Sequence, residues 1–192
     1  MEYQVIRKRI EDSISVKKNI LSDEKLLVRI GDVCAKITEC IARGNKIIMC
    51  GNGGSASDAL HFAGEVVGRF QRERAAWPAV ALNSDVATMT AISNDYGYDE
   101  IYNRQLQAHG VGGDVFVGIS TSGNSPNIIK AVRTAKEKDI FTVGLLGKDG
   151  GELSKLVDIP LVVPSLVTAR IQECHIMIIH IICEIIEDKL SC

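Results

Sequence analysis

The sequence lacks several features that would mark its class at once. Its 22 lysines and arginines are outnumbered by 24 acidic residues, giving a net charge of −2, so no basic field favours nucleic acid as a partner. Six cysteines are present, but they form no C-x-x-C pair and no regular spacing, which argues against a zinc cluster built from them. Most of them fall in apolar stretches, as buried reduced thiols do, and we expect a cytoplasmic protein.

We also expect no export signal and no membrane span from this amino-acid sequence. The first residues, MEYQVIRKRIEDS, contain no apolar core, so we expect no secretory signal there. The most apolar stretch, HIMIIHIICEII, is too short and too polar to cross a bilayer, which takes about 20 apolar residues. The 192 residues, 46% of them hydrophobic, show no repeat, low-complexity tract or linker, so we expect one domain over residues 1–192.

Alternation of apolar runs and helical patterns predicts the fold class. Residues 1–44 have helical spacing, in which Ser22 before Glu24 suggests a helix start and Gly44 a helix end. The expected strands are 46–50, 79–82, 114–119, 141–146 and 159–163. The helices expected between them are at about 57–70, 86–93, 100–109 and 126–138. This order predicts a doubly wound α/β domain over 45–192, with a mostly parallel five-stranded sheet and additional N-terminal helices.

The last predicted helix, Thr168 to Leu190, is apolar almost all round and is interrupted by His175, His180 and Glu184. A helix that is hydrophobic on every side is normally buried. One small sheet cannot cover this helix together with the two amphipathic helices of residues 1–44. We therefore expect packing between subunits and a homo-oligomer.

Two loops rich in glycine and serine carry the strongest functional signal. One reads GNGGSASD after the run KIIMC, and the other reads STSGNSPN after DVFVGI. Each separates a predicted strand from a helical pattern. Such a loop presents backbone N–H groups and hydroxyls at a helix N-terminus, where an anion is favoured. Two of them in one sheet predict a site for a phosphorylated ligand.

Ionisable residues on two helices leave alternatives open. His61 and Glu65 are neighbours on one helix face, either as a surface pair, with Glu65 also near Arg69, or as a site with a general base. His175 and His180 are either core histidines or ligands. Helical periodicity brings Glu173 into line with His180 better than Gln172, and does not settle which of them is its partner.

Asn94 and Asp95, in the segment SNDYGYD, have two possible roles. Asn, Asp and Gly supply turn conformations and side-chain caps. The same side chains could also hold the hydroxyls of a sugar.

At these residues the chain resembles the sugar isomerase (SIS) domain family and, within it, the phosphoheptose isomerases. The resemblance runs through nearly the whole chain and rests on the segments CGNGGSASDALHFAGE, SNDYGYD, GISTSGNSPNIIKA, LLGKDGGEL and ARIQECHIMIIH. It implies a cytoplasmic homotetramer with active sites formed between subunits. It also implies interconversion of sedoheptulose 7-phosphate and D-glycero-D-manno-heptose 7-phosphate, the first step towards heptoses of lipopolysaccharide, capsule or other surface glycans.

The resemblance also implies roles for individual residues. One divalent ion, usually zinc, would be held by His61, Glu65, Gln172 and His180, with Glu65 and Gln172 also touching the substrate. Other positions would bind the phosphate or the hydroxyls of the substrate through protein side chains or backbone. They are Asn52, Gly53, Gly54, Ser55, Asn94, Asp95, Ser120, Thr121, Ser122 and Ser125. Many relatives carry an acidic residue where this chain has Ala169, which leaves some substrate contacts open.

The implied reaction is an aldose–ketose isomerisation through a cis-enediol. Zinc would polarise the oxygens on C1 and C2, Glu65 would move the proton between these carbons, and His180 would handle hydroxyl protons. Because a metal-bound carboxylate is a weaker base, the reversed roles stay open. Two rival functions are an isomerase of another phosphosugar and a non-catalytic scaffold for the bacterial replication initiator. The scaffold relatives lack the equivalents of Glu65 and His180, which this chain has.

Overall fold

The computed structural model describes residues 2–191 and contains one parallel sheet of five strands in the order β2-β1-β3-β4-β5. The strands are β1 (Ile47–Gly51), β2 (Ala79–Ala81), β3 (Val115–Ser120), β4 (Phe141–Gly147) and β5 (Ile159–Val163). All five lie where the apolar runs predicted them. The order changes direction between β1 and β3, and ligands of such sheets bind beyond the carboxyl ends of those two strands.

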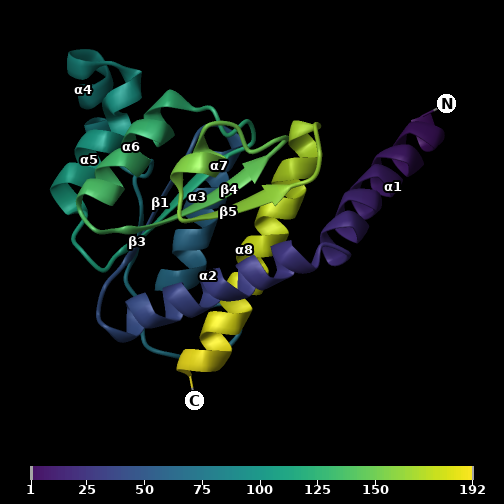
Figure 1. Ribbon diagram of the computed structural model, residues 1–192, viewed down its shortest axis with the longest axis horizontal. Coiled ribbons are helices and arrows are strands. Elements are labelled where there is room, and N and C mark those ends of the chain that lie inside the picture. The colour runs from purple at the N-terminus through teal and green to yellow at the C-terminus, as the bar shows by residue number, and fades with distance from the viewer. Residues whose placement is uncertain (1, 192) are drawn as a thin grey trace.

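Helices cover both faces of this sheet (Figure 1). The helices are α1 (Glu2–Leu21), α2 (Glu24–Ala42), α3 (Gly54–Val67), α4 (Val86–Tyr96), the short 3₁₀ helix η1 (Tyr98–Glu100), α5 (Ile101–His109), α6 (Pro126–Glu137), α7 (Leu153–Leu156) and α8 (Thr168–Leu190). One core cluster joins the sheet to α2, α3 and α8, and the other joins it to α5, α6 and α7. The doubly wound α/β fold is therefore confirmed.

The strand residues alternate between the two core clusters. Met49 of β1 and Val117 of β3 face the α2–α3–α8 layer, whereas Ile48 and Phe116 face the other layer. All four side chains are buried. Burial on both faces explains why these strands read as continuous apolar runs rather than alternating ones.

Helix ends differ in detail from the expected positions. Helix α2 is capped by Asp23, whose carboxylate accepts from the Leu26 N–H at 3.1 Å, so Ser22 is not the cap. Aspartate at this position satisfies a first-turn N–H that has no helical partner. Gly44 lies just past the end of α2 with φ of 79°, as a helix-ending glycine should.

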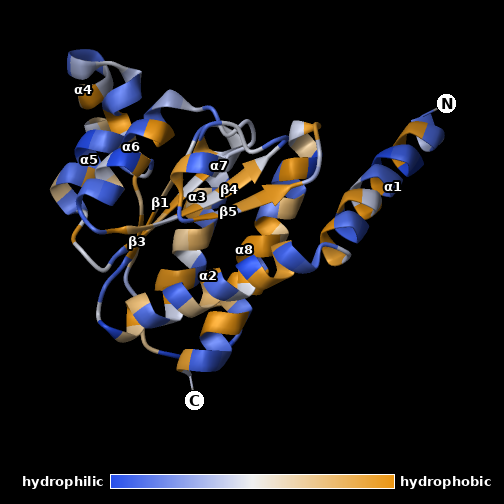
Figure 2. Ribbon diagram, in the orientation of Figure 1, coloured by the Kyte–Doolittle hydropathy of each residue, from blue (hydrophilic) through white to orange (hydrophobic). Residues whose placement is uncertain are grey.

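Helices α1 and α8 present apolar side chains that this single chain does not cover. Helix α1 projects from the body (Figure 1), and Tyr3, Ile6 and Ile10 on it are each more than half exposed. Much of α8 is hydrophobic (Figure 2), yet only one side of it is fully buried, and Ile181 remains 36% exposed. Within residues 2–191, no helix has the length and apolar character needed to cross a membrane.

Candidate functional site

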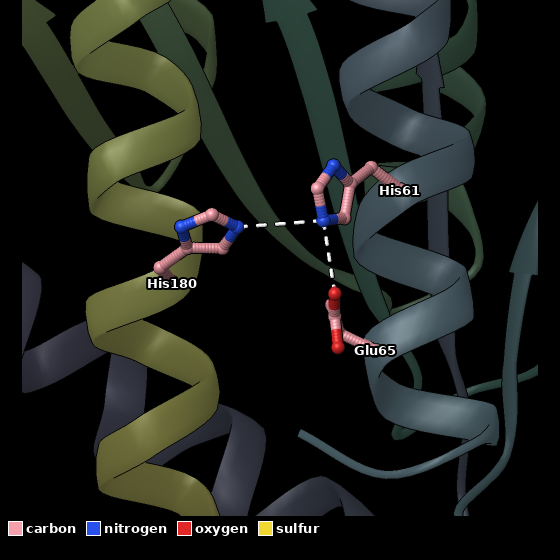
Figure 3. Close-up of side chains that lie close together, drawn as sticks. All are labelled: His61, Glu65 and His180. Atoms are coloured by element: carbon pink, nitrogen blue, oxygen red, sulfur yellow. Dashed lines mark hydrogen bonds and ion pairs between the residues drawn. The ribbon is translucent and has the colours of Figure 1, made fainter. Parts of the chain in front are cut away.

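Three chemically active side chains meet where α3 runs beside α8. His61 Nε2 lies 2.9 Å from Glu65 Oε1, and His180 Nε2 lies 3.4 Å from His61 Nε2. One ligand atom from each residue lies within 4.8 Å of the other two. Figure 3 shows the two imidazole rings pointing toward one another from neighbouring helices, with the Glu65 carboxylate next to His61. We call His61, Glu65 and His180 the trio.

The packing of α3 explains where the trio lies. Phe62 and Val66 are buried in the core, so the residues immediately before them, His61 and Glu65, turn to the flank of the helix. Their four-residue separation puts them on one face, as expected. The side chains of His61 and Glu65 are 45% and 24% exposed, so the trio opens to the surface of the chain.

Gln172 and Glu173 both lie away from the trio. The Gln172 amide packs against Gly54 so closely that a Cβ at residue 54 would overlap Nε2. Gln172 also precedes His180 by eight residues, or about 12 Å along the helix axis. Glu173 instead pairs with Arg170. Periodicity had favoured Glu173 as the partner of His180, and this chain brings neither residue to it.

His175 is a core residue. Its side chain is fully buried, and its Nε2–H donates to the Leu146 carbonyl at 2.9 Å. Burial lowers the pKa of His175 to about 4, although the hydrogen bond to Leu146 opposes the shift. The ring is therefore neutral at physiological pH and serves the packing of α8 on the sheet.

The second glycine-rich loop gathers its serines into a cluster. Ser120 Oγ lies 2.9 Å from Ser125 Oγ and 3.5 Å from Ser122 Oγ, and it accepts from the Gly123 N–H at 3.1 Å. Gly123 has φ of 67°, and a Cβ there would overlap the backbone of Gly150. The turn therefore requires glycine. We call Ser120, Ser122 and Ser125 the serine cluster; Thr121, between them, is half-buried.

The two loops meet through a pair of side-chain amides. Asn52 Nδ2 donates to Asn127 Oδ1 at 3.0 Å, and Asn127 Nδ2 donates back to Asn52 Oδ1 at 2.9 Å. The hydroxyl of Tyr98 donates to the same Asn52 oxygen at 2.9 Å. The sequence assigned no role to Asn127 or Tyr98, although both belong to the segments that carry the resemblance.

Both helices that follow the loops start without a side-chain cap. Gly53, which precedes α3, has no side chain, and the side chain of Ser125, which precedes α6, does not bond to the first turn. Ser55, in the first turn of α3, is almost fully buried. The positive ends of α3 and α6 therefore lie at the carboxyl ends of β1 and β3, where an anion is stabilised.

Asn94 and Asp95 lie in the last turn of α4, which extends beyond the predicted end at residue 93. Asn94 Nδ2 donates to Asp95 Oδ1 at 2.8 Å, and both residues are exposed. Their contacts within residues 2–191 do not include the serine cluster. Their sugar-binding role stays a prediction.

Asp58 is a further titratable group that the sequence did not single out. It lies on α3 between Gly54 and His61, and its Oδ2 is buried with no hydrogen-bond partner in the described chain. Burial raises the pKa of Asp58 to about 6, and the charge of His61 opposes that rise. The carboxyl group therefore titrates closer to neutrality than an ordinary aspartate.

One cavity of about 470 Å³ lies between α1 and the start of α8. Arg9, Ala169 and Arg170 are among its lining residues, and no member of the trio is. We place the candidate site at the trio rather than at this cavity, because the cavity is lined by one carboxylate, Asp12, and by no histidine.

Comparison with known proteins identifies the family. The family model described as the SIS domain matches residues 13–147. The phosphoheptose isomerase of Aneurinibacillus thermoaerophilus is 53% identical over 185 residues, which are 96% of this chain and 93% of that protein. Two solved phosphoheptose isomerases, from Neisseria gonorrhoeae and Francisella tularensis, are 40% and 37% identical, with TM-scores of 0.92 and 0.94. Each alignment covers 98% of this chain, with 100% and 99% of the respective structures.

Such identity, sustained over nearly the full length of each protein and matched by the same backbone, goes beyond a shared fold. The chain belongs to the SIS domain family and, within it, to the phosphoheptose isomerases.

Proposed function

We propose that this isomerase interconverts sedoheptulose 7-phosphate and D-glycero-D-manno-heptose 7-phosphate through a cis-enediol. The observation that carries the mechanism is the trio, in which two imidazoles and a carboxylate converge within 4.8 Å. The choice of this heptose pair is supported by relatives that are named phosphoheptose isomerases.

The trio also fits a divalent metal ion. Two imidazole nitrogens and a carboxylate oxygen form the donor set that zinc takes in catalytic sites. His61, Glu65 and His180 would hold the ion. Gln172 is the fourth ligand that the family resemblance implies, but in this chain its amide packs against Gly54, so it does not join the other three within one subunit. When bound, the ion supplies Lewis-acid polarisation of the oxygens on C1 and C2.

The side chains of the trio would move the protons. In the direction from ketose to aldose, the Glu65 carboxylate takes a proton from C1 and returns it to C2. His180 transfers a proton between the oxygens on C1 and C2, so that the carbonyl moves to C1 without net gain or loss of atoms. The reversed assignment gives the carbon-bound proton to His180. Substituting each residue separately distinguishes the two.

The serine cluster would bind the phosphate. Its hydroxyls and the start of α6 offer donors and a positive helix end to an anion. Asn52, Gly53, Gly54, Ser55 and Thr121 border the same edge of the sheet. Asn94 and Asp95 would hold sugar hydroxyls. This chain has Ala169 where many relatives carry an acidic residue, so no carboxylate would act from that position.

A homotetramer with active sites between subunits is part of the proposal. The exposed apolar side chains of α1 and the surface position of the trio support it, because a second subunit would cover both. The cytoplasm is the proposed location, in agreement with five buried free thiols. The product would enter a route to heptoses of lipopolysaccharide, capsule or another surface glycan.

The test is turnover of sedoheptulose 7-phosphate by purified protein, with chelator and after addition of zinc. We expect chelation to abolish formation of the aldoheptose phosphate and zinc to restore it. Activity that survives complete metal removal would refute the metal assignment. Absence of turnover in zinc-loaded protein would refute the substrate assignment.

A further inference from the structure

A buried ion pair lies beyond the trio at the far end of the same two helices. Glu187 is on α8, seven residues after His180, and its side chain is 2% exposed. Its carboxylate accepts from the backbone N–H groups of Phe70 (3.1 Å), Gln71 (2.7 Å) and Arg72 (2.8 Å), and from Arg74 Nε (3.0 Å). Four donors on one carboxylate fold the segment after α3 around α8.

Arg74 carries this connection back to α3. Its Nη2 donates to the Glu65 carbonyl at 2.9 Å, and its Nη1 donates to the Val66 carbonyl at 3.0 Å. These carbonyls belong to the last turn of α3, where helical donors run out. The guanidinium also stacks over Trp77 at 3.6 Å, and the side chain is only 5% exposed. One arginine therefore holds the turn that carries Glu65, a member of the trio.

Phe70 connects the same segment to His180 on α8. Its N–H is bound by Glu187, and its ring centroid lies 5.6 Å from that of His180. The segment that folds around Glu187 consequently touches both sides of the trio. It reaches Glu65 through the backbone of α3 and His180 through an aromatic contact.

We propose that Arg74 and Glu187 are positioning residues that set the register of α3 against α8 and thereby the geometry of His61, Glu65 and His180. The proposal rests on the proposed function of the trio. Neither side chain touches the trio's reacting atoms, so both act through the helices that carry them. The planar guanidinium matters because it binds Glu187 and the two α3 carbonyls at once, which a lysine ammonium on a flexible stem cannot reproduce.

The decisive variant is Arg74→Lys, which keeps the positive charge for Glu187 but loses the fork to the two carbonyls. Arg72→Lys is the matched control, because the Arg72 side chain pairs with Asp188 on the surface of the same segment. Glu187→Gln removes the negative charge of the Arg74–Glu187 pair, and it replaces Arg74→Lys as the test if that variant does not fold. Measurements are kcat and KM with sedoheptulose 7-phosphate, and zinc affinity by calorimetric titration of metal-free protein.

We expect Arg74→Lys to lower kcat and weaken zinc binding by about tenfold or more, as loss of a supporting contact to a metal site does. KM should change by less than about threefold, because the serine cluster is untouched, and the control should match the parent protein. A folded Arg74→Lys with a lower melting temperature but unchanged kcat and zinc affinity would overturn the proposal. If the parent protein binds no zinc, the metal assignment fails while the kcat comparison still decides this one.

Discussion

The serine cluster and the trio are assembled in different ways. The hydroxyls of Ser120 and Ser125 bond to each other within one loop. His61 and His180, by contrast, are 119 residues apart and meet only because α3 packs beside α8. A local loop keeps its geometry when distant parts of the chain change, whereas a site shared by two helices depends on everything that fixes their register. We expect substitutions at the loop to affect binding, and substitutions along the helices to affect the chemical step.

The largest effect should follow from Glu65→Gln, which removes the proposed base and keeps the shape of the side chain. We expect kcat to fall by at least about 10³-fold, within the range of general acid–base catalysis. KM should change little, because the serine cluster is intact. Steady-state kinetics would show this, with Glu73→Gln as a control because Glu73 is 89% exposed. A kcat within tenfold of the parent value would contradict the role of Glu65.

His175 lies between the trio and the serine cluster. It is on α8, which carries His180, and it bonds to Leu146, which pairs with Ser120 in the sheet. Its pKa is about 4 in the folded chain, against about 6.5 when unfolded. Below pH 6.5, His175 binds a proton in the unfolded chain but stays neutral in the folded chain. Stability therefore falls as pH decreases and levels off below pH 4.

Urea unfolding at pH 7 and pH 4.5 would measure this effect by comparing the parent protein with His175→Gln. The glutamine amide can still donate to Leu146 but does not titrate. We expect the parent protein to lose about 2–3 kcal/mol more than the variant between these two pH values. Equal losses in both proteins would show that His175 is not the buried neutral group described here.

Ser125→Ala should produce a smaller effect of the opposite kinetic type. Loss of one hydroxyl from the phosphate site should raise KM by about tenfold, the scale of a hydrogen bond to a charged group. Because binding of substrate and transition state weakens equally, kcat should stay within about twofold. Ser22→Ala, at an exposed position just after α1, is the control. A fall in kcat at constant KM would erase the distinction between the two regions.

Tyr98→Phe should have the smallest effect. It removes the hydroxyl that donates to Asn52, but Asn52 Oδ1 keeps its bond from Asn127. We expect KM to rise by no more than about threefold and the free energy of unfolding to fall by about 1 kcal/mol or less. Tyr96→Phe is the matched control, since its ring keeps the stacked Arg104. A tenfold increase in KM would mean that Tyr98 contacts the substrate directly.

The sequence predicted the fold well because parallel strands buried on both faces leave continuous apolar runs. Ile47–Gly51 and Val115–Ser120 both stand where such runs ended at glycine and serine. Helix ends were less certain, since Ser22 and Asp23 are both good caps and only the backbone decides between them. Helix α3 starts at Gly54, earlier than expected, because a glycine with φ of 57° turns the chain directly out of β1.

The site was predictable only where its geometry is local. His61 and Glu65 follow from helical spacing, and the serine cluster follows from a single loop. The family resemblance predicted that His61 and His180 share one site, whereas helical periodicity did not. Arg74 and Glu187 are 113 residues apart, and nothing in their surroundings marks either as buried. Pairing of that kind depends on how two helices pack, which a linear pattern does not record.

The five buried thiols have a consequence for experiments on this enzyme. Cys34, Cys40, Cys174 and Cys183 lie in the core layer that contains the trio's helices, and Cys50 lies in the opposite layer, while Cys192 is outside the described residues. Because these thiols are buried, alkylating reagents reach them only when the chain opens. Burial also raises the pKa of Cys34 to about 11 and that of Cys183 to about 12, which keeps both as unreactive thiols in the folded chain. Labelling rates, followed residue by residue by mass spectrometry, would thus time the opening of each layer separately without any engineered probe.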